Sequence, residues 1–137
     1  MLERLKTRIT QSEKQGGFTL IELLVVIIII GILLAIAVPS YLGFRERANR
    51  SAAQANVRAA IPSVETFSSD NDGYTGMTIP GLQGIDAGLS PTLAIGAVLD
   101  ADTYCISSTV GGFTYAYGLG NTGFTNGQVH EATCPTT

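Results

Sequence analysis

An apolar run occupies residues 18 to 38 and carries a single charged side chain, Glu22. On its amino-terminal side, Gly16-Gly17 separates it from a polar, basic segment. A helix needs about 20 apolar residues to cross a bilayer, so this run is long enough to span one. We therefore predict a transmembrane helix over residues 18–39.

Beyond residue 39 the pattern becomes amphipathic. Small and aromatic residues recur at steps of three and four, with arginines and other polar residues between them, which is the spacing of a helix with one apolar face. The predicted stripe comprises Tyr41, Phe44, Ala48, Ala52, Ala55 and Ala59. We expect an amphipathic helix over residues 40–69 that continues the first, is interrupted or kinked at Pro62, and packs its alanine stripe on the rest of the domain.

The remaining residues have the pattern of loops and short strands. Residues 70–100 are rich in glycine and are predicted to be a loop, with one helical turn between Pro91 and Leu99. Strands are predicted over 103–108, 112–117 and, from a weaker pattern, 124–134, all within a sheet region 101–137. The fold class is therefore predicted to be α+β, with a long amino-terminal helix packed on a small three- to four-stranded antiparallel sheet.

The 137 residues carry a net charge of -3, and the charges are unevenly distributed. No Lys or Arg follows Arg58, so the distal part is acidic throughout, which argues against a nucleic-acid groove on the head. The basic residues before the apolar run predict an amino terminus on the cytoplasmic side of the membrane.

The start of the apolar run resembles the type IV pilin family. The signature of that family is a glycine followed by Phe-Thr-Leu-Ile-Glu-Leu at the mouth of an apolar helix, and residues 17–23 match it without a gap. The resemblance implies that prepilin peptidase cuts between Gly17 and Phe18, which releases residues 1–17 as a leader. It also implies methylation of the new amino group of Phe18.

A secretory signal peptide is the alternative. Residues Ala35-Ile36-Ala37 fit an Ala-x-Ala site, and cleavage after Ala37 would release a small secreted domain, possibly enzymatic. The charge of Glu22 inside the apolar stretch, and the length of that stretch, argue against this scheme.

Glu22 has two candidate roles. Thr19-x-x-Glu22 has the spacing of a capping box, so the carboxylate would satisfy free backbone N–H groups at the start of the helix. A carboxylate in hydrocarbon is also unfavourable by about 2.5 to 3.5 kcal/mol, and ionisable residues there usually have a partner. The resemblance to pilins implies that this partner is the Phe18 amine of a neighbouring subunit, which would bring an incoming subunit into register.

Gly31 and Pro39 are weak points of the predicted helix. Proline removes a backbone donor, and glycine is unfavourable within a helix. We predict a bend near Pro39 in the single chain. In the polymer we predict extended or unwound chain between about Gly31 and Pro39, as the resemblance also implies; the alternative is a helix that tolerates both residues.

The two cysteines, Cys105 and Cys134, are predicted to form a disulfide, the default for an exported chain. The alternative pairs Cys105 with His130 as nucleophile and base, but no third group or oxyanion loop is evident. Residues 70–73 begin like a calcium loop yet lack its later glutamate. We predict no catalytic residue, no metal site and no cofactor.

The favoured interpretation is a non-enzymatic subunit of a type IV pilus. It would lie in the cytoplasmic membrane as a single-pass protein, in contact with lipid, before assembling into a cell-surface filament. The implied partners are copies of itself, prepilin peptidase and a pilus assembly platform. A pseudopilin of a type II secretion system, or a minor subunit of a competence pilus, is the nearest alternative.

The predicted amphipathic helix contains four arginines, Arg45, Arg47, Arg50 and Arg58. Two interpretations of these arginines remain open. They either face the acidic surface of another subunit or are solvated at the membrane interface.

Overall fold

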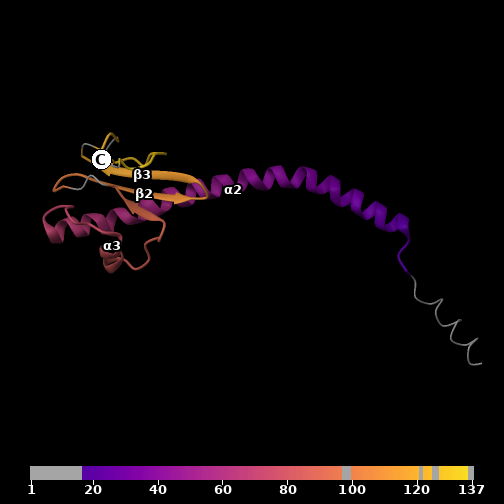
Figure 1. Ribbon diagram of the computed structural model, residues 1–137, viewed down its shortest axis with the longest axis horizontal. Coiled ribbons are helices and arrows are strands. Elements are labelled where there is room, and N and C mark those ends of the chain that lie inside the picture. Colours follow the sequence, from indigo (N-terminus) through magenta and orange to yellow (C-terminus); the bar gives the residue numbers. More distant parts are fainter. Residues whose placement is uncertain (1–16, 97–99, 121, 125–126, 136–137) are drawn as a thin grey trace, which may run out of the picture. The chain divides into compact units, whose positions relative to one another are not determined.

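The computed structural model describes residues 17–96, 100–120, 122–124 and 127–135. The elements in chain order are helix α2 (Leu20–Asn71), helix α3 (Ile79–Ile85), and strands β1 (Leu93–Ile95), β2 (Tyr104–Val110) and β3 (Phe113–Leu119) (Figure 1). The chain divides after Leu42 into two compact units. Residues 18–42 of the first unit are called the apolar segment below, and residues 43–137 are called the head. The predicted α+β class is confirmed.

Helix α2 includes Gly31, Pro39 and Pro62 without interruption. Ser40 follows the proline, and its hydroxyl donates to the Ile36 carbonyl oxygen at 3.2 Å, within the same helix. The bend near Pro39 and the unwinding in a polymer remain predictions. The predicted leader lies almost wholly outside the described residues, which begin at Gly17.

The head contains a three-stranded antiparallel sheet in the order β1-β2-β3. Val110 pairs with Phe113, so β2 and β3 form a tight hairpin through Gly111 and Gly112, whose φ angles are 58° and 88°. Glycine adopts these left-handed angles at little cost, which explains the pair of glycines at the turn. Figure 1 shows β2 and β3 running alongside the carboxyl-terminal part of α2.

One face of α2 packs on this sheet. Its buried residues are Ala53, Val57, Ala60, Ser63 and Val64. The predicted alanine stripe is therefore wrong in phase, because Ala55 and Ala59 are exposed. Val57 and Val64 lie on the buried face and bury more apolar area than alanines do, so they determine which face meets the sheet.

Two predictions for the region between helix and sheet are wrong. Leu93–Ile95 forms β1, not a helical turn, because Leu93 is buried in the core and its strand pairs with Ser108 to Ile106 of β2. The predicted loop also contains α3. This helix begins with a proline in its first turn and is capped by Thr78, whose hydroxyl accepts from the Gly81 N–H at 3.2 Å.

The predicted strand over 124–134 is also wrong. In the described part of this region, the pairing with the sheet is one isolated bridge between Ala116 and His130. The side chains of Cys134 and Glu131 hold the tail instead, so it does not need a continuous ladder of backbone hydrogen bonds.

Candidate assembly site

The apolar segment has large side chains that the described part of the chain leaves exposed. Their exposed fractions run from 48% at Val25 to 92% at Phe18. Burying one such side chain fully contributes about 1.5 to 3 kcal/mol, so the segment strongly favours contact with lipid or another chain. By length and composition, α2 is the one described helix that could cross a membrane.

Thr19 and Glu22 form a reciprocal cap where α2 begins. The Glu22 Oε2 atom accepts from the Thr19 N–H at 2.9 Å and from the Thr19 hydroxyl at 2.8 Å. In return, the Thr19 hydroxyl oxygen accepts from the Glu22 N–H at 3.2 Å. The first helical bond follows, from the Leu23 N–H to the Thr19 carbonyl oxygen. The capping box predicted for Glu22 is thus present in the single chain.

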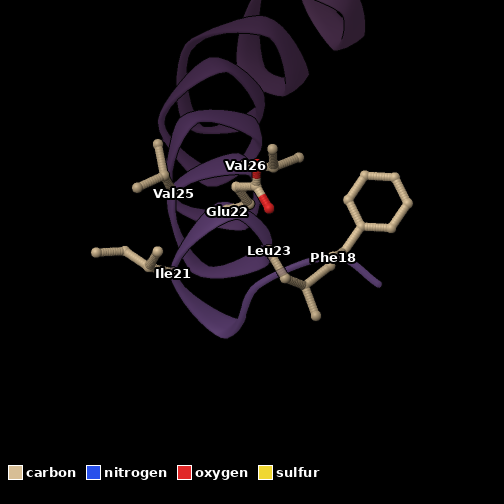
Figure 2. A pocket seen from close by; sticks show the side chains of 6 residues that line it. All are labelled: Phe18, Ile21, Glu22, Leu23, Val25 and Val26. Carbon is tan, nitrogen blue, oxygen red and sulfur yellow. The ribbon is translucent and has the colours of Figure 1, made fainter. Parts of the chain in front are cut away.

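The surroundings of the Glu22 carboxylate are apolar. Figure 2 shows it at the start of α2 among Phe18, Ile21, Leu23, Val25 and Val26, which line a shallow, open hollow. Within the described residues, both side-chain hydrogen bonds of the carboxylate fall on Oε2, and Oε1 accepts none. One carboxylate oxygen therefore remains available to a cation from outside the chain.

The peptide bond between Gly17 and Phe18 is accessible. Residues 17–19 precede the helix, are exposed, and have no regular structure. A Cβ placed on Gly17 would meet no atom within 4 Å. Nothing in the described chain therefore shields this bond, and cleavage there would convert the Phe18 nitrogen into a free amine four residues from Glu22.

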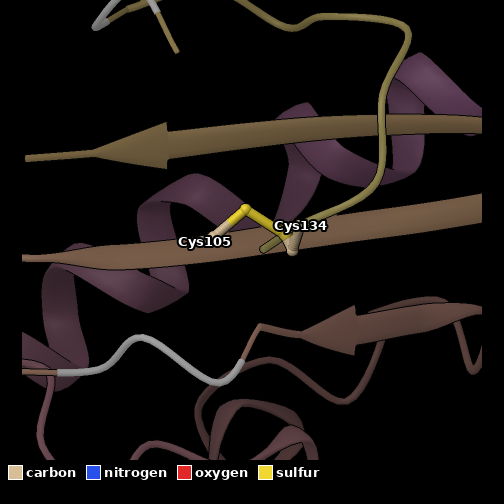
Figure 3. Close-up of a disulfide and its surroundings, with 2 residues drawn as sticks. All are labelled: Cys105 and Cys134. Atoms are coloured by element: carbon tan, nitrogen blue, oxygen red, sulfur yellow. A yellow bond between two sulfur atoms is a disulfide. The ribbon is translucent and has the colours of Figure 1, made fainter. Parts of the chain in front are cut away.

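Cys105 and Cys134 form a disulfide that joins the tail to the central strand of the sheet (Figure 3). Since Cys105 carries no free thiol, the alternative of a Cys105–His130 nucleophile has no support here. Gly96 passes close to the bridge: a Cβ there would lie 2.8 Å from the Cys134 Cβ and 3.2 Å from the Cys105 Cβ. Glycine at this position lets the chain pass the disulfide.

Besides the disulfide to the sheet, the tail is linked to α2 through Arg50. Its Nη1 lies 2.6 Å from both carboxylate oxygens of Glu131, and its guanidinium carbon is 4.1 Å from the ring centroid of Phe113. The Tyr115 hydroxyl donates to the same carboxylate at 3.2 Å. Sequence reasoning missed this cluster, because Arg50 and Glu131 are 81 positions apart and no local pattern connects them.

A family model and several known proteins match parts of this chain. Residues 13–38 match a family model described as the prokaryotic N-terminal methylation motif. The chain is 46% identical over 64 residues to type IV major pilin protein PilA of Myxococcus xanthus. It is 37% identical over 84 residues to type II secretion system core protein G of Escherichia coli, and 48% identical over 59 residues to type IV wide pilus major component PilA4 of Thermus thermophilus.

These alignments cover only part of each protein. They include 47%, 61% and 43% of this chain, respectively, and 29%, 57% and 45% of the three relatives. The chain thus spans less than two thirds of the length of each of these relatives. The match to the methylation motif falls on residues 13–38, which include the apolar run.

Proposed function

We propose that this chain, whose amino-terminal part is that of the type IV pilin family, is a structural subunit of a type IV pilus. The observation that carries the proposal is an apolar helical segment that its own chain leaves exposed, with one carboxylate at its start. Such a segment favours burial in a membrane or in a bundle of like segments. The chain therefore functions by assembling with other copies through this exposed segment.

Processing comes first in the proposed sequence of events. Prepilin peptidase cuts between Gly17 and Phe18, and the Phe18 amine is then methylated. The match to a methylation motif and the exposed, irregular chain at residues 17–19 support this step. The alternative cleavage after Ala37 would fall inside a helix that continues from Leu20 to Asn71, where the backbone is held by helical hydrogen bonds.

The Glu22 carboxylate then determines the register in which an incoming subunit joins the filament. In the proposed filament it pairs with the Phe18 amine of a neighbouring subunit, through the oxygen that the cap leaves free. The cap holds the carboxylate in place, while the amine neutralises its charge in an apolar setting. An incoming subunit that is out of register would leave both charges unpaired in hydrocarbon, which is unfavourable.

Before assembly, the subunit lies in the cytoplasmic membrane with its amino terminus inside, and an assembly platform in that membrane extracts it. The length and composition of the apolar segment support membrane insertion. The relatives are named as pilus and secretion components, which is in keeping with a non-enzymatic role. The finished filament lies on the cell surface.

A second candidate is a pseudopilin of a type II secretion system. The alignment with core protein G of Escherichia coli covers 84 residues, or 61% of this chain, against 64 residues, or 47%, for the Myxococcus pilin. Abundant long filaments under native expression would favour the pilus subunit, whereas short or absent filaments with a secretion defect on deletion would favour the pseudopilin.

The test compares wild type with Glu22→Ala and Thr19→Ala in cells that assemble the filament. Removing the carboxylate leaves the Phe18 amine unpaired, so we expect Glu22→Ala to lower filament yield about tenfold or more while cleavage and methylation proceed. Thr19→Ala removes the cap but keeps the charge, and we expect a much smaller loss. Mass spectrometry of the mature amino terminus and electron microscopy provide the two readouts.

Three outcomes would contradict parts of this proposal. Normal filaments from Glu22→Ala would exclude the pairing with Phe18. Equal losses from both variants would reduce Glu22 to a capping residue. A mature protein that begins at Val38 and stays monomeric would overturn the function itself.

A further inference from the structure

The head presents a second uncovered surface, on the side of α2 that faces away from the sheet. We call it the outward face, and it consists of exposed residues: Phe44, Ala48, Ser51, Ala55, Ala59 and Pro62. Successive members are three or four positions apart, and they lie opposite Ala53, Val57, Ala60 and Val64 of the core because the helix repeats every 3.6 residues. The result is a mainly apolar surface that the described residues leave exposed.

Arginines border this surface on both sides. We call Arg45, Arg47 and Arg58 the arginine rim; all three are exposed. Arg47 lies over the Phe44 ring, 5.8 Å from its centroid. Among the described residues, the one arginine with an ion pair is Arg50, which lies on the sheet side and binds Glu131. An apolar centre with arginine at its margin is a composition typical of protein–protein interfaces.

The opposite charge gathers where α2 ends. We call the exposed residues Asp70, Asp72, Asp100 and Asp102 the acidic end. Two loops bring them together: the Tyr74 N–H donates to the Asp100 carbonyl oxygen at 3.2 Å, and a Cβ on Gly73 would lie 2.8 Å from the Ala101 Cα. No Lys or Arg follows Arg58 in the sequence, so the neighbouring strands and loops supply no cation to these carboxylates.

We propose that the arginine-bordered outward face binds the acidic end of a second copy of this chain. The inference rests on the proposed filament, in which copies lie side by side. Each copy carries both halves of a complementary pair that it does not close within its own described structure. Contacts of this kind join like subunits head to tail and so continue along a polymer.

The spacing of the charges indicates which copies meet. Asp70 is 12 residues beyond Arg58 and 23 beyond Arg47, which corresponds to about 18 and 35 Å along the helix. Pairing of Glu22 with the Phe18 amine requires a shift of only about four residues, or about 6 Å. The arginine rim therefore contacts a more distant copy along the filament than the one that contacts Glu22, and the two contacts add rather than compete.

The test is a charge swap in the full chain. In Arg47→Glu/Arg58→Glu, like charges face each other, and we expect filament yield to fall about tenfold or more. Asp70→Lys/Asp102→Lys should cause a similar loss, since the rim then meets lysines. The variant with all four substitutions restores opposite charges, and its filament yield should return to near the wild-type level.

A matched pair of single substitutions controls for net charge. Arg58→Gln and Gln128→Glu each make the chain more negative by one charge, but Gln128 is an exposed residue of the tail outside both proposed surfaces. Only Arg58→Gln should lower the yield and the salt concentration at which filaments dissociate. Folding of each variant is checked by the absence of free thiols and by thermal unfolding.

The outcomes separate this inference from the proposed function. Normal filaments from Arg47→Glu/Arg58→Glu, or no recovery in the folded four-substitution variant, would overturn the inference while the pilus function stands. Loss of membrane retention in the first variant without rescue would instead assign the arginines to anionic lipid, and would equally overturn it. Failure of wild type to form filaments would remove the proposed function and this inference together.

Discussion

The apolar segment and the head use similar side chains in opposite ways. In the head, Val57, Leu82 and Ile106 are fully buried, whereas Val25, Ile28 and Leu33 of the apolar segment are 48%, 52% and 61% exposed. The head therefore gains its hydrophobic stabilisation within one chain, and the segment obtains it from lipid or from other copies. Substitutions in the head should change unfolding, whereas those in the segment should change insertion and assembly.

Their charges differ in the same way. Arg50 of the head has its partner, Glu131, in the same chain. Within the described residues, the Glu22 carboxylate of the segment has its hydrogen bonds with Thr19, and the cation proposed for it belongs to another subunit. A group satisfied within one chain contributes to folding, while a group left incomplete marks a surface where assembly takes place.

The largest expected effect concerns the disulfide of the head. Cys105 and Cys134 are separated by 29 positions. Closing a loop of this size stabilises a fold by about 3.5 kcal/mol in the chain-entropy model. The double variant Cys105→Ala/Cys134→Ser should lose about that much of the free energy of unfolding, measured by denaturant titration of the full chain in detergent.

The apolar segment contains no cysteine, so membrane retention of the same variant should match wild type. A loss of less than about 1 kcal/mol would show that the tail is held mainly by Arg50, Glu131 and the bridge to Ala116, since a surface ion pair contributes about 0 to 1 kcal/mol.

A pair of leucines tests the comparison directly. Leu82 of α3 is fully buried, and truncating a buried leucine to alanine costs about 2 to 5 kcal/mol, so we expect Leu82→Ala to destabilise the head by about 3 kcal/mol. Leu33 of the segment is 61% exposed, and Leu33→Ala should leave head unfolding unchanged. Thermal unfolding of both variants in detergent provides the measurement.

Leu33→Ala should still have a measurable effect, but on partition into the membrane or the filament. If it lowered the unfolding free energy of the head as much as Leu82→Ala does, the two regions would be one cooperative unit, and their division would be wrong.

Much of the fold could be predicted from the sequence because its strongest signals are local. The apolar run, followed by steps of three and four, predicts a helix from about residue 18 to 69, and α2 spans Leu20–Asn71. Two of the three predicted strands correspond to β2 and β3, whose hairpin carries adjacent glycines. The predictions fail where contacts between residues far apart in the sequence determine the local structure. Leu93 lies in a strand because that strand pairs with β2, and the tail is held by side-chain contacts.

The phase error of the alanine stripe has a similar cause. Alanines suit close packing, but Val57 and Val64, one face away, bury more area and so meet the sheet. The candidate assembly site could be proposed from the sequence, because Gly17, Phe18 and Glu22 lie within six positions, and its role remains a prediction. The Arg50–Glu131 pair could not be found, since only the folded sheet brings these residues together.

The smallest effect we predict is a pH dependence of the unfolding free energy, which the head should show and the apolar segment should not. Burial raises the pKa of the Tyr104 hydroxyl far above its ordinary value of about 10. The nearby Tyr117 and the Glu65 carboxylate, to which this hydroxyl donates at 3.2 Å, act in the same direction. The folded state thus favours the neutral tyrosine. Its contribution to stability is complete below about pH 10 and is lost as the pH rises further, by up to about 1.4 kcal/mol per pH unit.

Tyr104→Phe should therefore destabilise the head at neutral pH but not at alkaline pH. At pH 7 it removes one hydrogen bond to Glu65 and should cost about 1 kcal/mol, whereas by about pH 11 that difference should have vanished or reversed, since phenylalanine does not ionise. Tyr41→Phe, at a 65% exposed position of the apolar segment, should leave the pH dependence unchanged. Urea unfolding of both variants between about pH 7 and 11.5 provides the measurement. Parallel curves for wild type and Tyr104→Phe would mean that another group sets alkaline stability, and Tyr74, whose pKa burial also raises, would be the next residue to substitute.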